Sequence, residues 1–221
     1  MRPRIGTAFT AFSCAALLPA VLAGCDLTGT GPSGETVTET RPLTPFDAVD
    51  LAGVGDVTVV PGDDYGVTIT TDAVFLDGVE SEVVDGTLVL DEHYDFDTRD
   101  LDVDFVVTAP SVESVTLSGA GNITFEDVAG GPFDVNLDGA GNVTVSGNAK
   151  SAVLRLTGAG NVSARGLDAE TAEVELSGAG NVTVTATETL TVSLSGVGNV
   201  TYYGGAEVQS TTTGVGFVNA G

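Results

Sequence analysis

The chain has 221 residues, with 7 Lys and Arg against 31 Asp and Glu, and its formal net charge is −24. So acidic a chain repels nucleic acid and anionic lipid headgroups, and we expect no nucleic-acid partner. Its composition also includes only two Cys and one His, and no Trp. Few groups are therefore available for metal binding or nucleophilic catalysis, and we expect no cofactor.

Residues 1–24 have the pattern of an export signal. Arg2 and Arg4 form a basic start, an apolar run follows, and the segment ends in Leu22-Ala-Gly-Cys25. This ending resembles the lipobox of bacterial lipoproteins, in which small residues precede a Cys that receives lipid. The pattern predicts a lipoprotein signal peptide over 1–24 and lipidation of Cys25. The protein would then be exported and lipid-anchored to the bacterial cell envelope, with the membrane as its partner through that lipid.

Residues 25–45 are rich in Thr, Gly, Pro, Ser and Glu and lack apolar periodicity. Such composition is typical of a flexible linker. We therefore predict that the lipidated Cys25 is followed by a flexible tether up to residue 45. The folded domain is expected over 46–221.

The first part of this domain has the alternation of β-strands. Residues 57–60 and 67–70 are β-branched, and the turn residues 61–64 between them favour a hairpin. A second hairpin is expected over 83–90, because Asp85-Gly86 lies between two apolar runs. Residues 101–107 alternate apolar and acidic side chains, which predicts a strand with one buried face.

An acidic stretch over 91–104 is the one place where a cation could bind. Oxygen-rich clusters suit Ca²⁺, and Asp95, Asp97 and Asp100 are weak candidate ligands. The plainer interpretation is a solvated strand face whose charges discourage edge pairing. His93, the one histidine, has no evident nucleophile partner and is expected at the surface.

A tandem repeat dominates the second half of the chain. The phrase Leu117-Ser-Gly-Ala-Gly-Asn-Ile-Thr124 recurs four times, and a decayed copy covers 212–219. The copies follow one another at steps of 18–20 residues. Such a period indicates one small unit stacked on itself. The repeated corner residues are Gly119, Gly121, Asn122, Gly139, Gly141, Asn142, Gly158, Gly160, Asn161, Gly178, Gly180, Asn181, Gly196, Gly198 and Asn199.

Each repeat predicts one coil of an all-β fold, a single-stranded parallel β-helix with hairpins in its N-terminal part. Apolar residues alternate before and after each Gly-x-Gly, so both arms would present one face to a core. Gly permits a bend with φ > 0, and stacked Asn side chains would form a hydrogen-bonded ladder. The small apolar residue between the two Gly is expected to point inward. Right-handed winding is the default for parallel crossovers.

These motifs resemble the bacterial family named putative autotransporter adhesin, head GIN domain. The likeness begins at the segment Phe46–Val59 with its Gly-Val-Gly-Asp corner, continues through the repeats, and includes Val200-Thr-Tyr-Tyr-Gly204. It covers about Phe46 to the last residue. The family implies an exported, often lipid-anchored β-helical domain with a role in adhesion, and it supplies no catalytic or binding residues.

The sequence therefore predicts a non-enzymatic, lipid-anchored envelope protein that serves as an adhesion or surface scaffold module, with a surface glycan or protein as ligand. Two alternatives stay open at this point. One is a glycan-active enzyme built on a β-helix, because acidic residues are abundant, although few Arg and Lys accompany them. The other is an envelope module that binds divalent cations through the acidic stretch.

Overall fold

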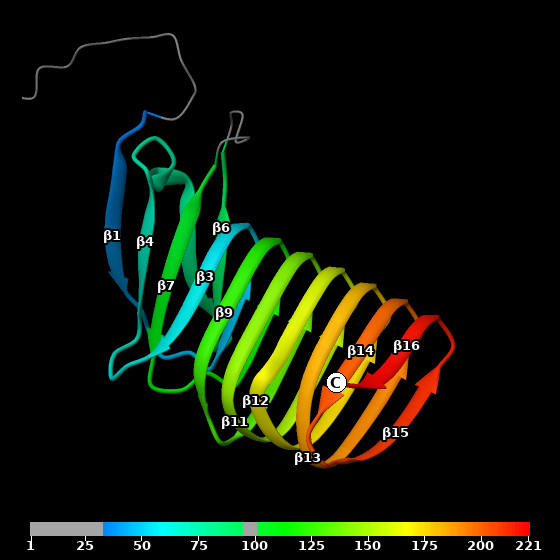
Figure 1. Cartoon of the computed structure of the whole chain (residues 1–221). Coiled ribbons are helices and arrows are strands. Elements are labelled where there is room, and N and C mark those ends of the chain that lie inside the picture. The colour runs from blue at the N-terminus through cyan, green and yellow to red at the C-terminus, as the bar shows by residue number, and fades with distance from the viewer. Residues whose placement is uncertain (1–32, 95–100) are drawn as a thin grey trace, which may run out of the picture.

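The computed structural model describes residues 33–94 and 101–221. Within these ranges sixteen β-strands join into one continuous sheet that winds into a long solenoid (Figure 1). One turn of 3₁₀ helix, η1 (Leu76–Gly78), interrupts them. No helix in this part of the chain is long and apolar enough to span a bilayer.

The strands fall into two groups. The N-terminal group contains β1 (Thr36–Pro42), β2 (Ala48–Leu51), β3 (Val54–Pro61), β4 (Gly66–Asp72), β5 (Val79–Val84), β6 (Thr87–Glu92) and β7 (Val103–Ala109). The repeats supply β8 (Ser114–Leu117), β9 (Ala120–Ala129), β10 (Pro132–Leu137), β11 (Ala140–Leu156), β12 (Ala159–Leu176), β13 (Ala179–Leu194), β14 (Val197–Tyr203), β15 (Glu207–Thr212) and β16 (Val215–Ala220).

The repeats form a parallel β-solenoid, as the sequence predicts. Each coil runs along one broad face, bends at Gly-x-Gly, and returns along the other face (Figure 1). Coils stack in register, so that Gly121 pairs with Gly141, and Gly141 with Gly160. We call the face after the bend, made by β3, β9, β14, β16 and the first halves of β11–β13, the amide face. The other is the opposite face. Right-handed winding stays a prediction.

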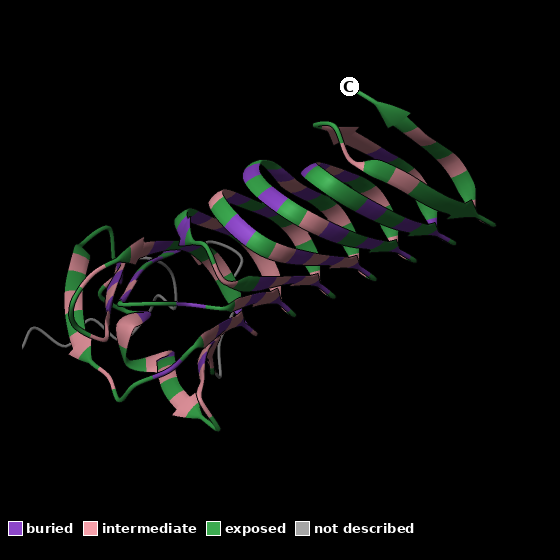
Figure 2. Cartoon of the chain, turned by 90° about the horizontal axis from the view of Figure 1, so that it is seen from below, coloured by how far each residue is buried: buried purple, intermediate pink, exposed green. Residues whose placement is uncertain are grey.

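Ladders of apolar side chains fill the interior of the solenoid. Leu117, Leu137, Leu156, Leu176 and Leu194 stack in register and are fully buried. Purple buried positions alternate with exposed ones along each coil in Figure 2. Burial of one Leu or Val side chain stabilises a fold by about 1.5–3 kcal/mol. Since the described residues contain no disulfide, these ladders and the backbone hydrogen bonds hold the coils together.

The N-terminal group extends the two faces with antiparallel strands. On the amide face the order is β1-β4-β7-β3, and on the opposite face it is β5-β6-β2. The expected hairpin over 83–90 is confirmed as β5 and β6, whose turn residues Asp85 and Gly86 both have positive φ. The expected hairpin of 57–60 with 67–70 is wrong, because β7 lies between β3 and β4 and pairs with both.

The flexible tether predicted over 25–45 is wrong for residues 36–42, which form β1 along β4. Two side-chain contacts support this edge, Thr38 with Thr70 at 3.1 Å and Thr40 with Thr68 at 3.0 Å between hydroxyl oxygens. Cross-strand Thr pairs of this kind stabilise a sheet modestly. The packed part of the chain therefore begins before residue 46.

Arg41 joins the two faces at the N-terminal end. Its Nη1 donates hydrogen bonds to the carbonyl oxygen of Val79 at 2.8 Å and to Ser81 Oγ at 3.2 Å. Because Arg41 lies on β1 and both acceptors lie on β5, the guanidinium connects the outermost strands of the sheet. Glu39 pairs with the same guanidinium at 2.6 Å. This end of the solenoid is thus closed.

Candidate functional surface

The repeated glycines lie where neighbouring coils come closest. A Cβ added to Gly139 would overlap the carbonyl oxygen of Gly119, and one on Gly141 would overlap that of Gly121. Gly141 also has φ of +147°, a conformation that other residues rarely adopt. The Gly-x-Gly phrase is therefore required by the tight stacking of backbones at the corner.

The Asn of each repeat forms the ladder that the sequence suggests. Along the amide face, Nδ2 of each Asn donates to Oδ1 of the Asn in the preceding coil. The four distances are 2.8 Å for Asn142 to Asn122, 2.8 Å for Asn161 to Asn142, 3.0 Å for Asn181 to Asn161 and 3.2 Å for Asn199 to Asn181. Asn122 continues the row by donating to Asp56 Oδ1 at 2.8 Å. We call these five Asn the amide row.

The residue between the two glycines points outward, so the expectation that it points inward is wrong. Ala140, Ala159 and Ala179 are exposed, and the side chain of Val197 is 58% exposed. The close approach occurs at the flanking glycines, whose missing side chains leave room for the backbone of the next coil. The middle residue is thereby turned toward solvent.

A second row of polar side chains runs beside the amide row. It lies two residues further along each strand and carries a hydroxyl group in six successive coils: Thr58, Thr124, Thr144, Ser163, Thr183 and Thr201. Parallel strands lie about 4.8 Å apart, so this hydroxyl row repeats at that spacing. Together the two rows give a chain of high negative charge a long uncharged surface that can donate and accept hydrogen bonds.

The first Gly-x-Gly corner stacks on the coil of β6 and β7, which has no Gly-x-Gly of its own, and a side chain takes the place of that corner. In later corners the backbone N–H of the middle residue donates to the glycine carbonyl below, as Ala140 N does to Gly119 O at 2.9 Å. At the first corner, Val54 N instead donates to the carboxylate of Glu92 at 2.8 Å. Burial raises the pKa of Glu92 above its usual value, although the Val54 hydrogen bond opposes the rise. Glu92 therefore ends the corner stack.

The candidate cation ligands Asp95, Asp97 and Asp100 lie outside the described residues, as does Cys25. Two later acids of the stretch are described. Asp104 on β7 pairs in register with Asp56, and its pKa is raised by burial and by the charges of Asp102 and Asp56. No group of three or more potential metal ligands of the His, Cys, Asp or Glu type occurs within 33–94 and 101–221.

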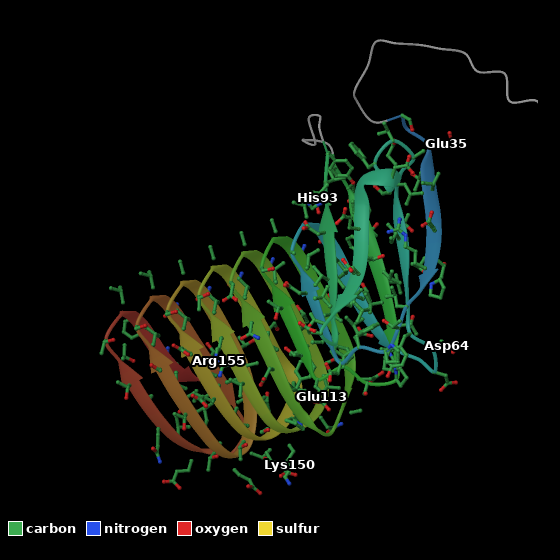
Figure 3. The ribbon with its side chains drawn as sticks, turned by 180° about the vertical axis from the view of Figure 1, so that it is seen from behind. Glu35, Asp64, His93, Glu113, Lys150 and Arg155 are labelled. Carbon is green, nitrogen blue, oxygen red and sulfur yellow. The ribbon has the colours of Figure 1, made fainter. Side chains whose placement is uncertain are left out.

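The basic groups His93, Arg155 and Lys150, which could take part in catalysis, lie far apart. Figure 3 shows His93 at the N-terminal end, Arg155 on the opposite face, and Lys150 at the lower rim of the coils. His93 is exposed, with Nδ1 3.6 Å from Glu80 Oε2. Arg155 lies 3.9 Å from Glu175, and both are half exposed. These positions assemble no acid–base pair around a common cleft.

An open hollow of about 560 Å³ lies beside the turn that joins β3 to β4. Its lining includes Arg41, Asp63, Asp64 and Tyr65. The guanidinium of Arg41 is bound to β5, as described above, so the hollow presents two carboxyl groups without an arginine opposite them. It does not supply the arrangement of Asp with Arg or Lys that sugar-cleaving β-helices use.

The fold places the chain among the parallel β-solenoid proteins. A family model extends this assignment: residues 45–206 match that of the putative auto-transporter adhesin, head GIN domain. Because the match covers most of the chain, the protein belongs to this family, as its motifs suggest. Among curated proteins, none matches the chain.

Several solved structures are similar to this chain, one of them with a TM-score above 0.5. A putative adhesin from Bacteroides fragilis NCTC 9343 superposes with a TM-score of 0.65 at 22% identity, over 87% of this chain and 100% of that chain. A putative adhesin from Parabacteroides merdae ATCC 43184 gives 0.46 at 18% identity, over 86% and 98%. A putative lipid binding protein from Parabacteroides distasonis ATCC 8503 gives 0.45 at 18% identity, over 86% and 98%.

Three residues of structural importance were not singled out from the sequence. Arg41 and Glu92 close the N-terminal end, and Asp72 fixes the first described residues. The Asp72 carboxylate accepts hydrogen bonds from Ser33 Oγ and Gly34 N, both at 2.7 Å, and its contacts lower its pKa to about 2, the Val74 N–H contributing most. Each acts on a segment distant in sequence, and the only available signal was a charged residue, which for Glu92 lay within the acidic stretch 91–104.

Proposed function

We propose that this protein is a non-enzymatic, lipid-anchored envelope protein whose stacked coils act as an adhesion module. Membership of an adhesin family supports a role at the cell surface. The observation that carries the proposal is the paired amide and hydroxyl rows. They form a regular, uncharged array of hydrogen-bonding groups along one face of the solenoid.

A neutral surface glycan is the ligand that this array suits. Sugar hydroxyls can both donate and accept hydrogen bonds, as can the Thr hydroxyls and Asn amides of the two rows. An acidic polymer would be repelled by a chain of net charge −24. A repeating polymer would also contact several coils at once, and multiple weak contacts add to a strong attachment.

The membrane anchor is part of the same proposal. The signal pattern that ends at Cys25 supports export and lipidation, and the described domain starts only eight residues later at Ser33. The anchor would therefore lie next to the N-terminal end of the solenoid. The coils would extend away from that point of attachment.

The hydroxyl row offers a direct test of adhesion. Beads carrying the full chain should bind an immobilised neutral polysaccharide, and a triple variant with Thr144→Val, Ser163→Ala and Thr183→Val should bind at least tenfold less. Each lost hydrogen bond contributes about 0.5–1.5 kcal/mol, and 1.4 kcal/mol corresponds to a factor of ten. A matched triple variant on the opposite face, Thr116→Val, Thr191→Val and Ser193→Ala, should bind like the native chain.

Equal loss in both triple variants, or turnover of the polysaccharide by the native chain, would overturn the proposal. The anchor is tested separately with cells that express Cys25→Ala. The native chain should incorporate a labelled fatty acid and stay with membranes, whereas the variant should incorporate none and leave the membrane fraction. Label incorporated equally by both chains would contradict lipidation of Cys25.

A further inference from the structure

The last coil of the described chain has an unpaired edge. β15 pairs only with β13 and β16 only with β14 among the described strands. The N–H groups of Val215 and Phe217 on β16, and of Gly221 directly after it, point to the preceding coil, where they donate to Gly196 O, Asn199 Oδ1 and Tyr202 O. Because these groups alternate along a parallel strand, those of the intervening Gly216, Val218 and Ala220 point away from it.

This edge lacks the features that normally prevent strands from pairing. Residues 208–221 contain no charged residue and no Pro, although the chain as a whole carries 31 acids. Edge strands of monomeric proteins are usually protected by charges, Pro or a covering segment. The outer strands at the N-terminal end follow that rule, since β1 contains Glu39, Arg41 and Pro42, and Arg41 connects it to β5.

The side chains of β16 are also unusually apolar for an exposed strand. Val215 is 71% and Phe217 is 69% exposed, the highest values among the exposed large hydrophobic residues of the described chain. Phe217 occupies the position next to Asn199 where every earlier coil has Asn or Asp. Figure 2 shows this final coil as largely exposed, in contrast to the preceding ones. The amide row thus ends in an aromatic ring.

We propose that this edge pairs with the same edge of a second copy of the chain, which gives a two-fold, end-to-end dimer. A two-fold axis perpendicular to the amide face would set β16 antiparallel to β16 of the second copy. The register that the free backbone groups favour places Gly216 opposite Val218, since both have N–H and C=O groups pointing outward. Phe217 then lies opposite Phe217 of the second copy, in a cross-strand aromatic pair.

Charge and symmetry favour a second copy over another partner. The acidic body of one molecule repels that of another, and the last coil, which carries no charged side chain after Glu207, is the region where two copies meet with least repulsion. The contact is isologous, so each copy uses the same strand. At the opposite end, the edge strand β1 carries charges and Pro and is tied to β5 by Arg41, so we expect assembly to stop at two copies.

The pairing does not depend on the anchor or on glycan binding. One consequence rests on the proposed function: if Cys25 carries lipid, the paired ends point away from the two anchors. Figure 1 shows the last coil at the far end of the solenoid from β1. Two copies on facing membranes could then join end to end.

The first test is the mass of the native full chain, purified in detergent and measured by light scattering that separates protein from detergent. We expect twice the mass of one chain, as mass spectrometry of the same preparation gives it. Phe217→Lys should weaken the dimer at least tenfold, because it places like charges opposite each other. Val106→Lys, which adds the same charge at an exposed position of β7, should leave the dimer unchanged. A native monomer, an open-ended polymer or a dimeric Phe217→Lys chain would overturn the proposal.

A second test does not depend on the stability of the charged variant. In oxidising detergent solution, Phe217→Cys should form a disulfide-linked dimer, because opposite Cα atoms in an antiparallel pair lie about 4.5–5.5 Å apart. Asn219→Cys should not, because its opposite residue is Val215. A native chain treated alike controls for Cys25. Absence of the Phe217→Cys crosslink, or equal crosslinking at 219, would contradict the pairing.

Discussion

The two ends of this solenoid are built differently. At the N-terminal end, antiparallel strands flank the coils, Arg41 connects the outer strands, and Glu92 accepts the hydrogen bond that the glycine carbonyl of a neighbouring corner accepts elsewhere. At the C-terminal end, β15 and β16 continue the parallel pattern and carry no charge after Glu207.

The difference shows what a stacked fold requires beyond its repeat. Within the coils, each repeat supplies the hydrogen-bond partners and apolar contacts that its neighbour needs, so the same motif can recur five times. An end has a neighbour on one side only, and its backbone groups and apolar side chains need other partners. The N-terminal end supplies these from distant residues of the same chain, and we infer that the C-terminal end takes them from a second copy.

The largest effect is expected where coils are in closest contact. Gly141→Ala should destabilise the fold by about 4 kcal/mol or more, because the new Cβ overlaps the Gly121 backbone and φ is positive. Gly131→Ala meets no atom within 4 Å and should change stability by less than about 0.5 kcal/mol. Urea unfolding measures both. A small change in the free energy of unfolding of Gly141→Ala would show that neighbouring coils are not tightly packed at the corner.

A pair of core variants separates the interior of the solenoid from its last coil. Leu156→Ala should cost about 2–5 kcal/mol, since this side chain is fully buried between neighbouring Leu residues. Val208→Ala should cost less than about 1 kcal/mol in the monomer, because Val208 is half-buried on the open coil. Thermal unfolding compares the two. Equal losses would mean that the last coil is as well covered as the others.

The N-terminal closure is tested by Arg41→Met. Loss of the guanidinium hydrogen bonds to β5 should cost about 1–2 kcal/mol, and hydrogen exchange should accelerate in β1 and β5 but not in β12. Arg155→Met removes an exposed pair at 3.9 Å and should cost less than about 0.5 kcal/mol. Faster exchange throughout the coils of the Arg41 variant would contradict a local role.

The smallest effect concerns pH. Because the folded-state pKa of Glu92 is raised above its usual value of 4.5, the folded state binds this proton more tightly than the unfolded state. The contribution of Glu92 to stability is therefore largest below pH 4.5 and falls as pH rises through the raised pKa. Glu92→Gln removes the titration. The stability of the native chain relative to this variant should decrease from pH 4.5 toward 7, as urea unfolding would show. An increase would contradict the burial of this carboxyl group.

The repeat predicted the coils because every copy repeats the same local information. Its glycines predicted the corners. Asn142 and Asn161 predicted the ladder, because like residues stack on one another when coils are in register. The prediction that the Ala140 side chain points inward was wrong, because its direction is set by close contact with the neighbouring coil, between Gly141 and the Gly121 backbone.

The N-terminal strands were harder to predict because their partners are distant. β1 contains mostly Thr, Glu and Arg, and it becomes a strand through pairing with β4 about 30 residues later. The turn after β3 has the residues of a hairpin, yet β7 enters between the two strands. The local composition of β3 and β4 does not reveal that a third strand, residues 103–109, is inserted between them.

Amide hydrogen exchange as a function of protein concentration tests the contrast between the two ends most directly. The account predicts that exchange of the outward-pointing Val218 amide slows as the full chain is concentrated, whereas exchange in β1 stays constant. Exchange at Val218 that is independent of concentration, or a slowing in β1 of equal size, would contradict a solenoid closed at one end and paired at the other.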